Sequence, residues 1–167
     1  SARYAPLLYR TADGGRSWAS IAANLPDNGP VKVVREDPKN PSLLFAGTEF
    51  GLFASVDRGA RWFRFGGLPT VAVDDIVIHP RDLDMVVATH GRSLYVVDDL
   101  RPLEELTSAV RASEAHLFSI RPVVGRYPLP GWTDWSGAAE FRGANPPGGA
   151  LISFWVRRFT GQPVSIS

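Results

Sequence analysis

An eight-residue pattern occurs twice in the chain, and this repetition limits what the chain can fold into. The first copy, residues 11–18, reads TADGGRSW, and the second, residues 55–62, reads SVDRGARW. A hydroxyl residue, an aspartate, a glycine and a tryptophan occupy equivalent positions, and Asp13 and Asp57 lie 44 residues apart. Self-similarity at a fixed period of roughly 20–50 residues indicates a repeat architecture, in which each unit buries its apolar face against its neighbours.

The residues of this pattern suit a tight turn between two strands. An aspartate accepts hydrogen bonds from backbone N–H groups shortly after it, glycine adopts positive φ without steric cost, and tryptophan covers the turn. We therefore assign a structural role to the residues that the two copies share, namely Thr11, Asp13, Gly15, Trp18, Ser55, Asp57, Gly59 and Trp62.

An alternative role for Asp13 and Asp57 is that of catalytic carboxylates or cation ligands. A feature that recurs once per repeat suits the fold better than a single site, so the structural role is favoured. The second copy has Arg61 where the first has Ser17. We expect fewer hydrogen bonds in the second turn, because arginine lacks the hydroxyl group.

Short strands surround both turns. Apolar and β-branched runs predict strands near 7–11, 17–23, 31–34, 43–48, 51–55 and 62–65, and the same order begins again at 76–78, 85–89 and 94–98. After Asp98 no glycine and tryptophan follow, so the repeat ends there. Four short strands per period of roughly 40–50 residues is typical of the blades of a β-propeller.

The rest of the chain departs from this repeat. Pro102 at a first helical position and Glu104 and Glu105 near a positive N-terminal end predict a short helix near 102–110. Residues 115–120 predict a further strand, the outer one of the last repeat. Prolines and glycines predict a linker over 127–149, and apolar residues at 151–156 predict another strand.

Three further stretches extend the likeness from a motif to a family. VVATHGRSLYVVDDL at 86–100 resembles the closing blade of bacterial BNR-repeat (Asp-box) proteins, and AHLF at 115–118 and RGANPPGGALI at 142–152 are similar to the segments that follow it. The family includes sortilin N-terminal-like and photosystem II assembly factor-like proteins, and its members are often labelled glycosyl hydrolases.

The resemblance implies an all-β fold in three parts. The last two to three four-stranded blades of a larger propeller, including the short helix, occupy 1–126. A linker occupies 127–149, and the first strands of a β-sandwich-like module occupy 150–167. The resemblance further implies an exported bacterial protein, periplasmic or extracellular, whose remaining blades are partners of this chain. A partial propeller of this kind is expected to be insoluble or to associate when expressed alone.

Composition excludes several classes of function. The 18 lysines and arginines against 17 aspartates and glutamates leave a formal net charge of +1, which gives no electrostatic footprint for nucleic acid or an anionic membrane. The absence of cysteine excludes disulfides and thiolate chemistry. No apolar run approaches the roughly 20 residues of a membrane span, so no membrane insertion is expected. The histidines lack metal-ligand spacing, so no metal or cofactor is predicted.

Candidate binding residues lie in the loops between the second and third strands of successive repeats. In the family these loops lie opposite the Asp-box turns, near the central channel. Arg92 would clamp a carboxylate, Glu49 would act as an acid or base, and Phe50 would stack on a sugar or peptide. His90 lies in the same loop as Arg92. The alternative is that His90 and Arg92 brace the loop against neighbouring elements.

No catalytic set can be assigned. The doublets 74–75 and 98–99 are aspartate pairs, but adjacent strand residues point to opposite faces, so turn and cap roles are expected. No nucleophile elbow or HExxH motif occurs. Two functions therefore stay open. One is a non-catalytic binding or scaffolding propeller for peptides or glycans. The other is a glycoside hydrolase, sialidase- or xyloglucanase-like, whose catalytic residues lie largely outside these 167 residues.

Overall fold

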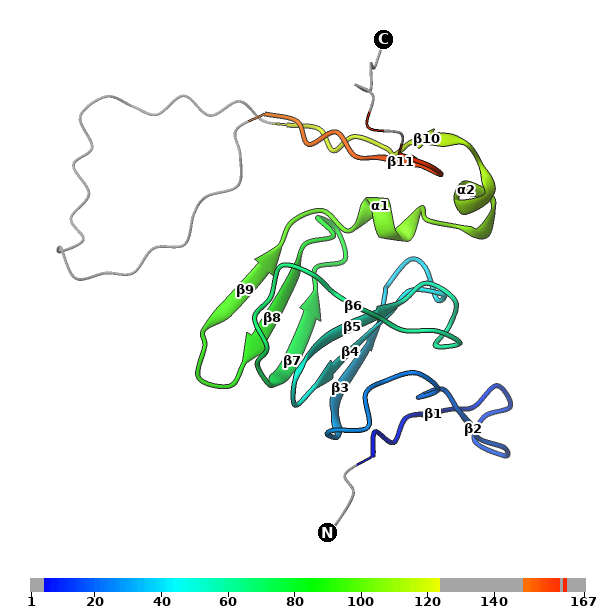
Figure 1. Ribbon diagram of the computed structural model, residues 1–167, viewed down its shortest axis with the longest axis vertical. Coiled ribbons are helices and arrows are strands. Elements are labelled where there is room, and N and C mark those ends of the chain that lie inside the picture. The colour runs from blue at the N-terminus through cyan, green and yellow to red at the C-terminus, as the bar shows by residue number, and fades with distance from the viewer. Residues whose placement is uncertain (1–4, 124–148, 160, 162–167) are drawn as a thin grey trace, which may run out of the picture.

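The computed structural model describes residues 5–123, 149–159 and 161 (Figure 1). The described part is all-β, with strands in antiparallel sheets and little helix. The linker predicted at 127–149 lies outside the described residues except for Gly149, as does the predicted C-terminal unit beyond 161. No helix in the described part is long and apolar enough to cross a membrane.

Four antiparallel sheets form the described part. A first hairpin pairs β1 (Tyr9–Arg10) with β2 (Ala19–Ser20). A four-stranded sheet follows, in the order β3 (Val31–Glu36), β4 (Leu44–Thr48), β5 (Gly51–Ser55) and β6 (Phe63–Arg64). A three-stranded sheet contains β7 (Val73–Ile78), β8 (Met85–Thr89) and β9 (Leu94–Val97). Finally, β10 (Ala115–Leu117) pairs with β11 (Phe154–Val156).

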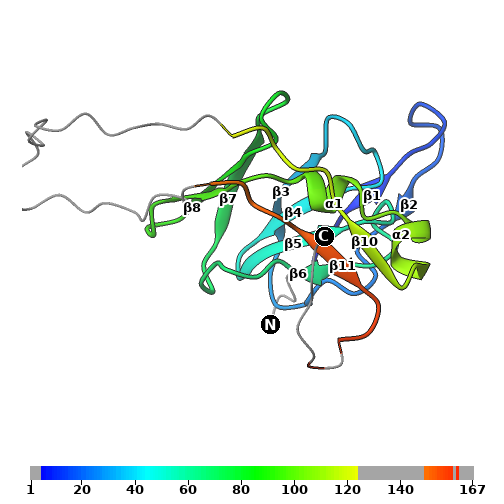
Figure 2. The same ribbon diagram turned by 90° about the horizontal axis from the view of Figure 1, so that it is seen from above.

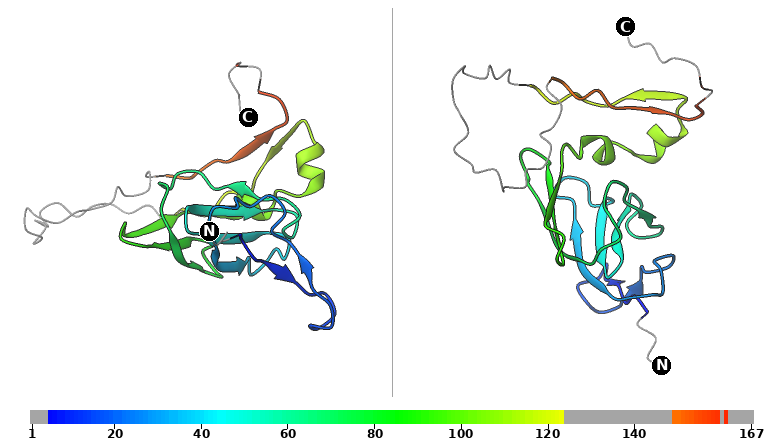
Figure 3. Two further views of the ribbon diagram at one scale, coloured as in Figure 1. Left: turned by 60° about the horizontal axis from the view of Figure 1, so that its bottom comes forward. Right: turned by 60° about the vertical axis from the view of Figure 1, so that its left-hand side comes forward.

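The four-stranded sheet lies between the first hairpin and the three-stranded sheet, as the right-hand view of Figure 3 shows. All five residues of β4 are buried, as its nearly continuous apolar sequence predicts. Phe45 packs toward Ile76 and Met85 of the three-stranded sheet, whereas Leu44 packs with Trp62 toward the first hairpin. Each face of this sheet therefore contributes to a separate core.

Gly47 explains how closely the two larger sheets approach. A Cβ atom at this position would lie 2.6 Å from Cγ1 of Val33 and 2.6 Å from Cγ1 of Val73. Real side chains do not tolerate such contacts, so a residue larger than glycine at the centre of β4 would push β3 and β7 away.

The helical region differs from the single helix predicted near 102–110. Two short helices occur instead, α1 (Arg101–Glu104) and α2 (Ser108–Ala112). Thr107 separates them, because its extended backbone and its Oγ1 atom, which accepts a hydrogen bond from the Val110 N–H at 3.3 Å, make it the N-cap of α2. Because Thr107 starts a new helix, α1 ends at Glu104 and does not continue to residue 110.

The strand predicted at 115–120 also has a different place. This strand is β10, and it pairs with β11 rather than with the outer edge of β9, so its predicted role as the outer strand of the last repeat was wrong. The two helices carry the chain away from β9 before the strand begins. Figure 2 shows β11 crossing in front of the β3–β4–β5–β6 sheet, on the side where α1 lies in Figure 1.

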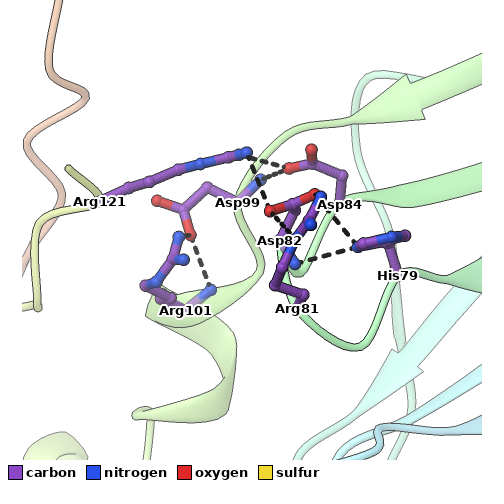
Figure 4. A network of polar contacts seen from close by, with 7 residues as sticks. All are labelled: His79, Arg81, Asp82, Asp84, Asp99, Arg101 and Arg121. Atoms are coloured by element: carbon purple, nitrogen blue, oxygen red, sulfur yellow. Dashed lines mark hydrogen bonds and ion pairs between the residues drawn. The ribbon is translucent and has the colours of Figure 1, made fainter. Parts of the chain in front are cut away.

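Polar contacts attach the segment after β10 to the three-stranded sheet (Figure 4). Oδ1 of Asp84 accepts hydrogen bonds from Nη1 of Arg121 at 2.8 Å and from the backbone N–H of Asp99 at 3.0 Å. Asp99 in turn binds Arg101 with 2.5 Å between Oδ1 and Nη1. His79 Nδ1 accepts a hydrogen bond from the Asp82 N–H at 3.1 Å. These contacts join α1 and the segment after β10 to the turn between β7 and β8.

Candidate functional site

The loops that carry the four candidate binding residues lie at one end of the two larger sheets. Thr48 pairs with both Val31 and Gly51, and Thr89 pairs with Val73, so the ends of β4 and β8 and the starts of β3, β5 and β7 meet there. We call this end of the sheets the loop end. The second aspartate turn follows β5 at its other end, five residues or roughly 16 Å away.

A chain of ionic contacts connects the two loops at the loop end. Lys32 Nζ lies 2.6 Å from Asp74 Oδ1 and 3.4 Å from Glu49 Oε2. Nδ1 of His90 lies 3.2 Å from Asp74 Oδ2. The structure therefore brings Glu49 and His90 into one cluster, although they do not touch each other directly. We call these four residues the ionic chain.

Electrostatics keep the centre of the ionic chain charged. The hydrogen bond from Lys32 lowers the pKa of the Asp74 carboxyl group, and a smaller contribution comes from His90. The same hydrogen bond raises the pKa of the Lys32 ammonium group, which burial opposes. Both groups are therefore ionised near neutral pH, and the ion pair joins β3 of one sheet to β7 of the next.

Phe50 covers the turn that precedes β3. A Cβ atom at Gly29 would lie 3.2 Å from Cε2 of Phe50 and 2.9 Å from the Cβ atom of Glu49, so only glycine allows the loop to pack here. The Phe50 side chain stays 38% exposed. One part of the ring packs against the turn, and the rest faces outward beside Glu49.

Arg92 is separated from the ionic chain by two positions in the β8–β9 loop. In the described part of the protein its guanidinium group makes no hydrogen bond or ion pair. Arg92 lines an open cavity of about 490 Å³ together with Gly91, Ser93, Leu94 and Tyr95. A guanidinium group beside such a cavity suits a carboxylate or another planar anion.

His90 differs from Arg92 in its surroundings. Its ring contacts Asp74, and its backbone N–H donates to the carbonyl oxygen of Ala72 at 2.9 Å. These contacts suit a bracing role between the β8–β9 loop and the start of β7. The bracing alternative therefore fits His90. Among the described residues, Arg92 makes no contact of this kind, so bracing is not supported for Arg92.

Two members of the ionic chain, Lys32 and Asp74, are not among the four candidate binding residues predicted from the sequence. Lys32 stands between Val31 and Val33, the ordinary alternation of a half-buried strand, so nothing beside it indicates a partner on a neighbouring sheet. Asp74 was considered only as part of an aspartate doublet. Its partner Lys32 is 42 residues away, a separation that no local pattern can identify.

The expectation that the doublet 74–75 serves in turns or caps was wrong. Asp74 binds Lys32, and Asp75 binds Arg35 with 2.6 Å between Oδ1 and Nη2. Both aspartates reach β3 because the register between β7 and β8 shifts between Val73 and Asp75. An irregularity of this kind interrupts the alternation of side chains on which the expectation depended.

The two aspartate turns share one hydrogen-bond pattern. In the first, Asp13 Oδ1 accepts from the Ser17 N–H at 2.9 Å, and Thr11 Oγ1 accepts from the Gly15 N–H at 2.8 Å. In the second, Asp57 Oδ1 accepts from the Arg61 N–H at 2.9 Å, and Ser55 Oγ accepts from the Gly59 N–H at 2.8 Å. Both carboxylates are thus engaged by their own turns.

One hydroxyl group distinguishes the two turns. Ser17 Oγ donates to Asp13 Oδ2 at 2.6 Å, and Arg61 has no equivalent group. This bond is the main reason why the pKa of the Asp13 carboxyl group falls to about 2. The tryptophans differ as well. Trp62 is 4% exposed and donates from Nε1 to the Ile21 carbonyl oxygen, whereas Trp18 is 62% exposed and donates to Gly15 of its own turn.

Comparisons with protein families and with curated proteins find no match to this chain. Within the described residues, no group of three or more histidine, aspartate or glutamate side chains is arranged to hold a metal ion. At the loop end Arg92 and Phe50 are exposed, and the ionic chain connects the two loops that carry them.

Proposed function

We propose that this chain is the C-terminal part of a BNR-repeat (Asp-box) β-propeller and that it binds a ligand at the loop end without catalysing a reaction. The β3–β4–β5–β6 and β7–β8–β9 sheets are successive blades, and the remaining blades of an exported bacterial parent protein are their partners. The matching hydrogen bonds of the two aspartate turns and the stacked order of the sheets support this assignment.

The observation that carries the binding function is the ionic chain beside an arginine with no counter-ion in the described part. Lys32 and Asp74 fix the two loops relative to each other, so Arg92 and Phe50 are presented by a preorganised surface. The ligand is a peptide or glycan that carries a carboxylate for Arg92 and an apolar or sugar face for Phe50.

Glycoside hydrolysis is the second candidate, because Glu49 and Asp74 both contact Lys32 and form a pair of carboxylates. The same lysine argues against it. A general acid needs a raised pKa, whereas the pKa of Asp74 is lowered and Glu49 faces a cation. The catalytic residues of a hydrolase would then lie largely outside this chain.

The binding function predicts that Arg92→Ala weakens ligand binding about tenfold or more while the melting temperature stays nearly unchanged. Arrays of acidic glycans and peptides, followed by calorimetry with the best ligand, measure this effect. Arg16→Ala is the matched control, because it removes an exposed arginine of the first aspartate turn, outside the two loops that carry the candidate residues.

Two results would contradict the binding function. If Arg92→Ala lowers the melting temperature by several degrees and leaves binding intact, Arg92 braces the loop. If the protein hydrolyses chromogenic glycosides and Glu49→Gln abolishes the turnover, the protein is an enzyme and Glu49 belongs to its active site.

A further inference from the structure

Asn40 brings two carboxyl residues together between the β3–β4 turn and helix α1, because its backbone N–H binds Asp37 and its side chain binds Glu104. Asp37 follows β3 directly and is only 3% exposed. Glu104 is the last residue of α1, and its backbone carbonyl oxygen accepts a hydrogen bond from Nδ2 of Asn40 at 2.7 Å. The turn and the helix, which lie 64 residues apart between Asn40 and Glu104, are therefore in direct contact.

Each of the two carboxyl groups has one buried oxygen without a hydrogen-bond donor in the described part of the protein. Oδ1 of Asp37 accepts hydrogen bonds from the backbone N–H groups of Lys39 at 2.9 Å and Asn40 at 2.8 Å. Oδ2 of Asp37 and Oε1 of Glu104 are buried and have no hydrogen-bond donor within residues 5–123, 149–159 and 161. Two acceptor oxygens buried together repel each other when both groups are ionised, and one proton between them turns the contact into a hydrogen bond.

We propose that Asp37 and Glu104 share one proton and form a pH-sensitive latch, which holds α1 against the β3–β4 turn and loosens when the proton is lost. Glu104 carries the proton and donates it from Oε1 to Oδ2 of Asp37. Asp37 is the acceptor, because Oδ1 holds its carboxyl group in place through two backbone N–H bonds and Oδ2 is turned to the buried side. When the latch loosens, the proton passes to solvent and both groups become carboxylates.

The surroundings of Glu104 set the pH at which the latch changes. Burial raises the pKa of its carboxyl group, and the charge of Asp37 raises it further, to about 7. Lys39 of the β3–β4 turn and Arg101 of α1 oppose this shift without reversing it. The docked helix therefore binds more protons than the released helix between pH 4.5, the ordinary pKa of a glutamate side chain, and about pH 7, the raised pKa of Glu104. Docking weakens as pH rises through this window and changes little above it.

The latch acts locally. The segment after β10 has its own attachment through Arg121 and Asp84, and Arg121 is cationic at every relevant pH. The buried Leu100 precedes α1 and ties its first turn to the core between the two larger sheets. Loss of the proton is therefore expected to free α1 and the start of α2 while the sheets stay folded.

Hydrogen exchange of the whole 167-residue chain tests the latch. After correction for intrinsic rates, the amides of residues 103–106 should exchange about tenfold faster or more at pH 8 than at pH 5.5, since one group can change the opening equilibrium up to tenfold per pH unit. Glu104→Gln keeps a donor toward Asp37 and should abolish this difference. Glu105→Gln is the matched control, because Glu105 instead binds Ser119, and it should retain the difference.

A second variant and a direct titration keep the test decisive. Asp37→Asn retains the Oδ1 acceptor and adds a donor toward Glu104, so it should also remove the pH dependence. Carboxyl ¹³C NMR should show Glu104 titrating above pH 6 in the unaltered chain. A midpoint below pH 5, pH-independent exchange, or loss of the high-pH opening in 1 mM CaCl₂ would each overturn the proposal, the last by indicating a cation in place of the proton.

Discussion

A single hydroxyl group distinguishes the two aspartate turns at the residue scale. Ser17 gives Asp13 a side-chain hydrogen bond that Arg61 cannot give Asp57, while the backbone bonds of the two turns have equal lengths. The sequence difference between the copies therefore has a local electrostatic consequence. It does not change the shape of the turn.

Ser17→Ala is expected to raise the pKa of the Asp13 carboxyl group from about 2 toward 3.8. Because its pKa is lowered, ionised Asp13 stabilises its turn fully at pH values above 3.8, the ordinary pKa of the group. This contribution is lost as pH falls through the lowered pKa of about 2. Carboxyl ¹³C titration between pH 1.5 and 6 measures the shift. Ser20→Ala, which removes a hydroxyl that binds only the Ala22 N–H, should leave Asp13 unchanged. An unchanged pKa in Ser17→Ala would show that the Thr11 hydroxyl and the backbone donors account for the shift.

Local chemistry could be predicted from sequence at this scale, and distant pairing could not. The turn residues interact within four positions of one another, so a short pattern contains all of their partners. Lys32 and Asp74, by contrast, meet only because β3 and β7 stack and because the register of β7 shifts beside Asp74. Neither the stacking nor the irregularity leaves a mark in the sequence near either residue.

At the element scale, the two tryptophans show what the repeat does. Trp62 lies at the start of β6 and connects the four-stranded sheet to the first hairpin. Its backbone pairs with the side-chain amide of Asn24, and its indole ring is buried against the core of the hairpin. Trp18 holds the equivalent sequence position and is mostly exposed. Trp62 therefore joins its own sheet to the hairpin that precedes it in the chain.

Trp62→Ala is expected to lower the free energy of unfolding by about 3–5 kcal/mol, because it leaves a large cavity and an unpaired carbonyl group at Ile21. Trp18→Ala is the matched substitution at the exposed position and should cost about 0.5 kcal/mol or less. Urea unfolding followed by circular dichroism compares the two. If both substitutions lowered the free energy of unfolding equally, the different solvent exposure of the two tryptophan side chains would not explain their contributions to stability.

The strands of the repeat and the later strands at 115–120 and 151–156 were predicted, whereas the pairing of β10 with β11 and the break in the helical region were not. The predicted runs at 31–34, 43–48 and 51–55 correspond to β3, β4 and β5, since apolar periodicity reports burial directly. The pairing of β10 with β11 joins residues about 40 positions apart, and the composition of either strand does not specify a partner. The break between α1 and α2 depends on one cap at Thr107, which competed with an otherwise continuous helical pattern.

At the scale of the whole molecule, the outer face of the three-stranded sheet has no cover among the described residues. Gly47 pairs with Leu52 and Ala88 pairs with Leu94, so the two leucines hold equivalent places in the two larger sheets. Leu52 is 1% exposed beneath the three-stranded sheet, and Leu94 is 64% exposed. Val77 and Val96 are exposed on the same sheet. The comparison within one chain indicates that this face is built to contact another sheet.

We therefore expect the 167-residue chain to associate when it is purified alone, because an exposed apolar face larger than a few hundred Å² promotes contacts between copies. The double variant Leu94→Lys, Val96→Lys should shift the chain toward a monomer in size-exclusion chromatography with light scattering. Phe159→Lys is the control, since this side chain is 72% exposed away from the sheet, and it should leave association unchanged. A monodisperse monomer with a sharp cooperative melt in the unaltered chain would contradict the expectation. The outer face would then be an ordinary solvated surface, and the proposed need for further blades would lose its main energetic reason.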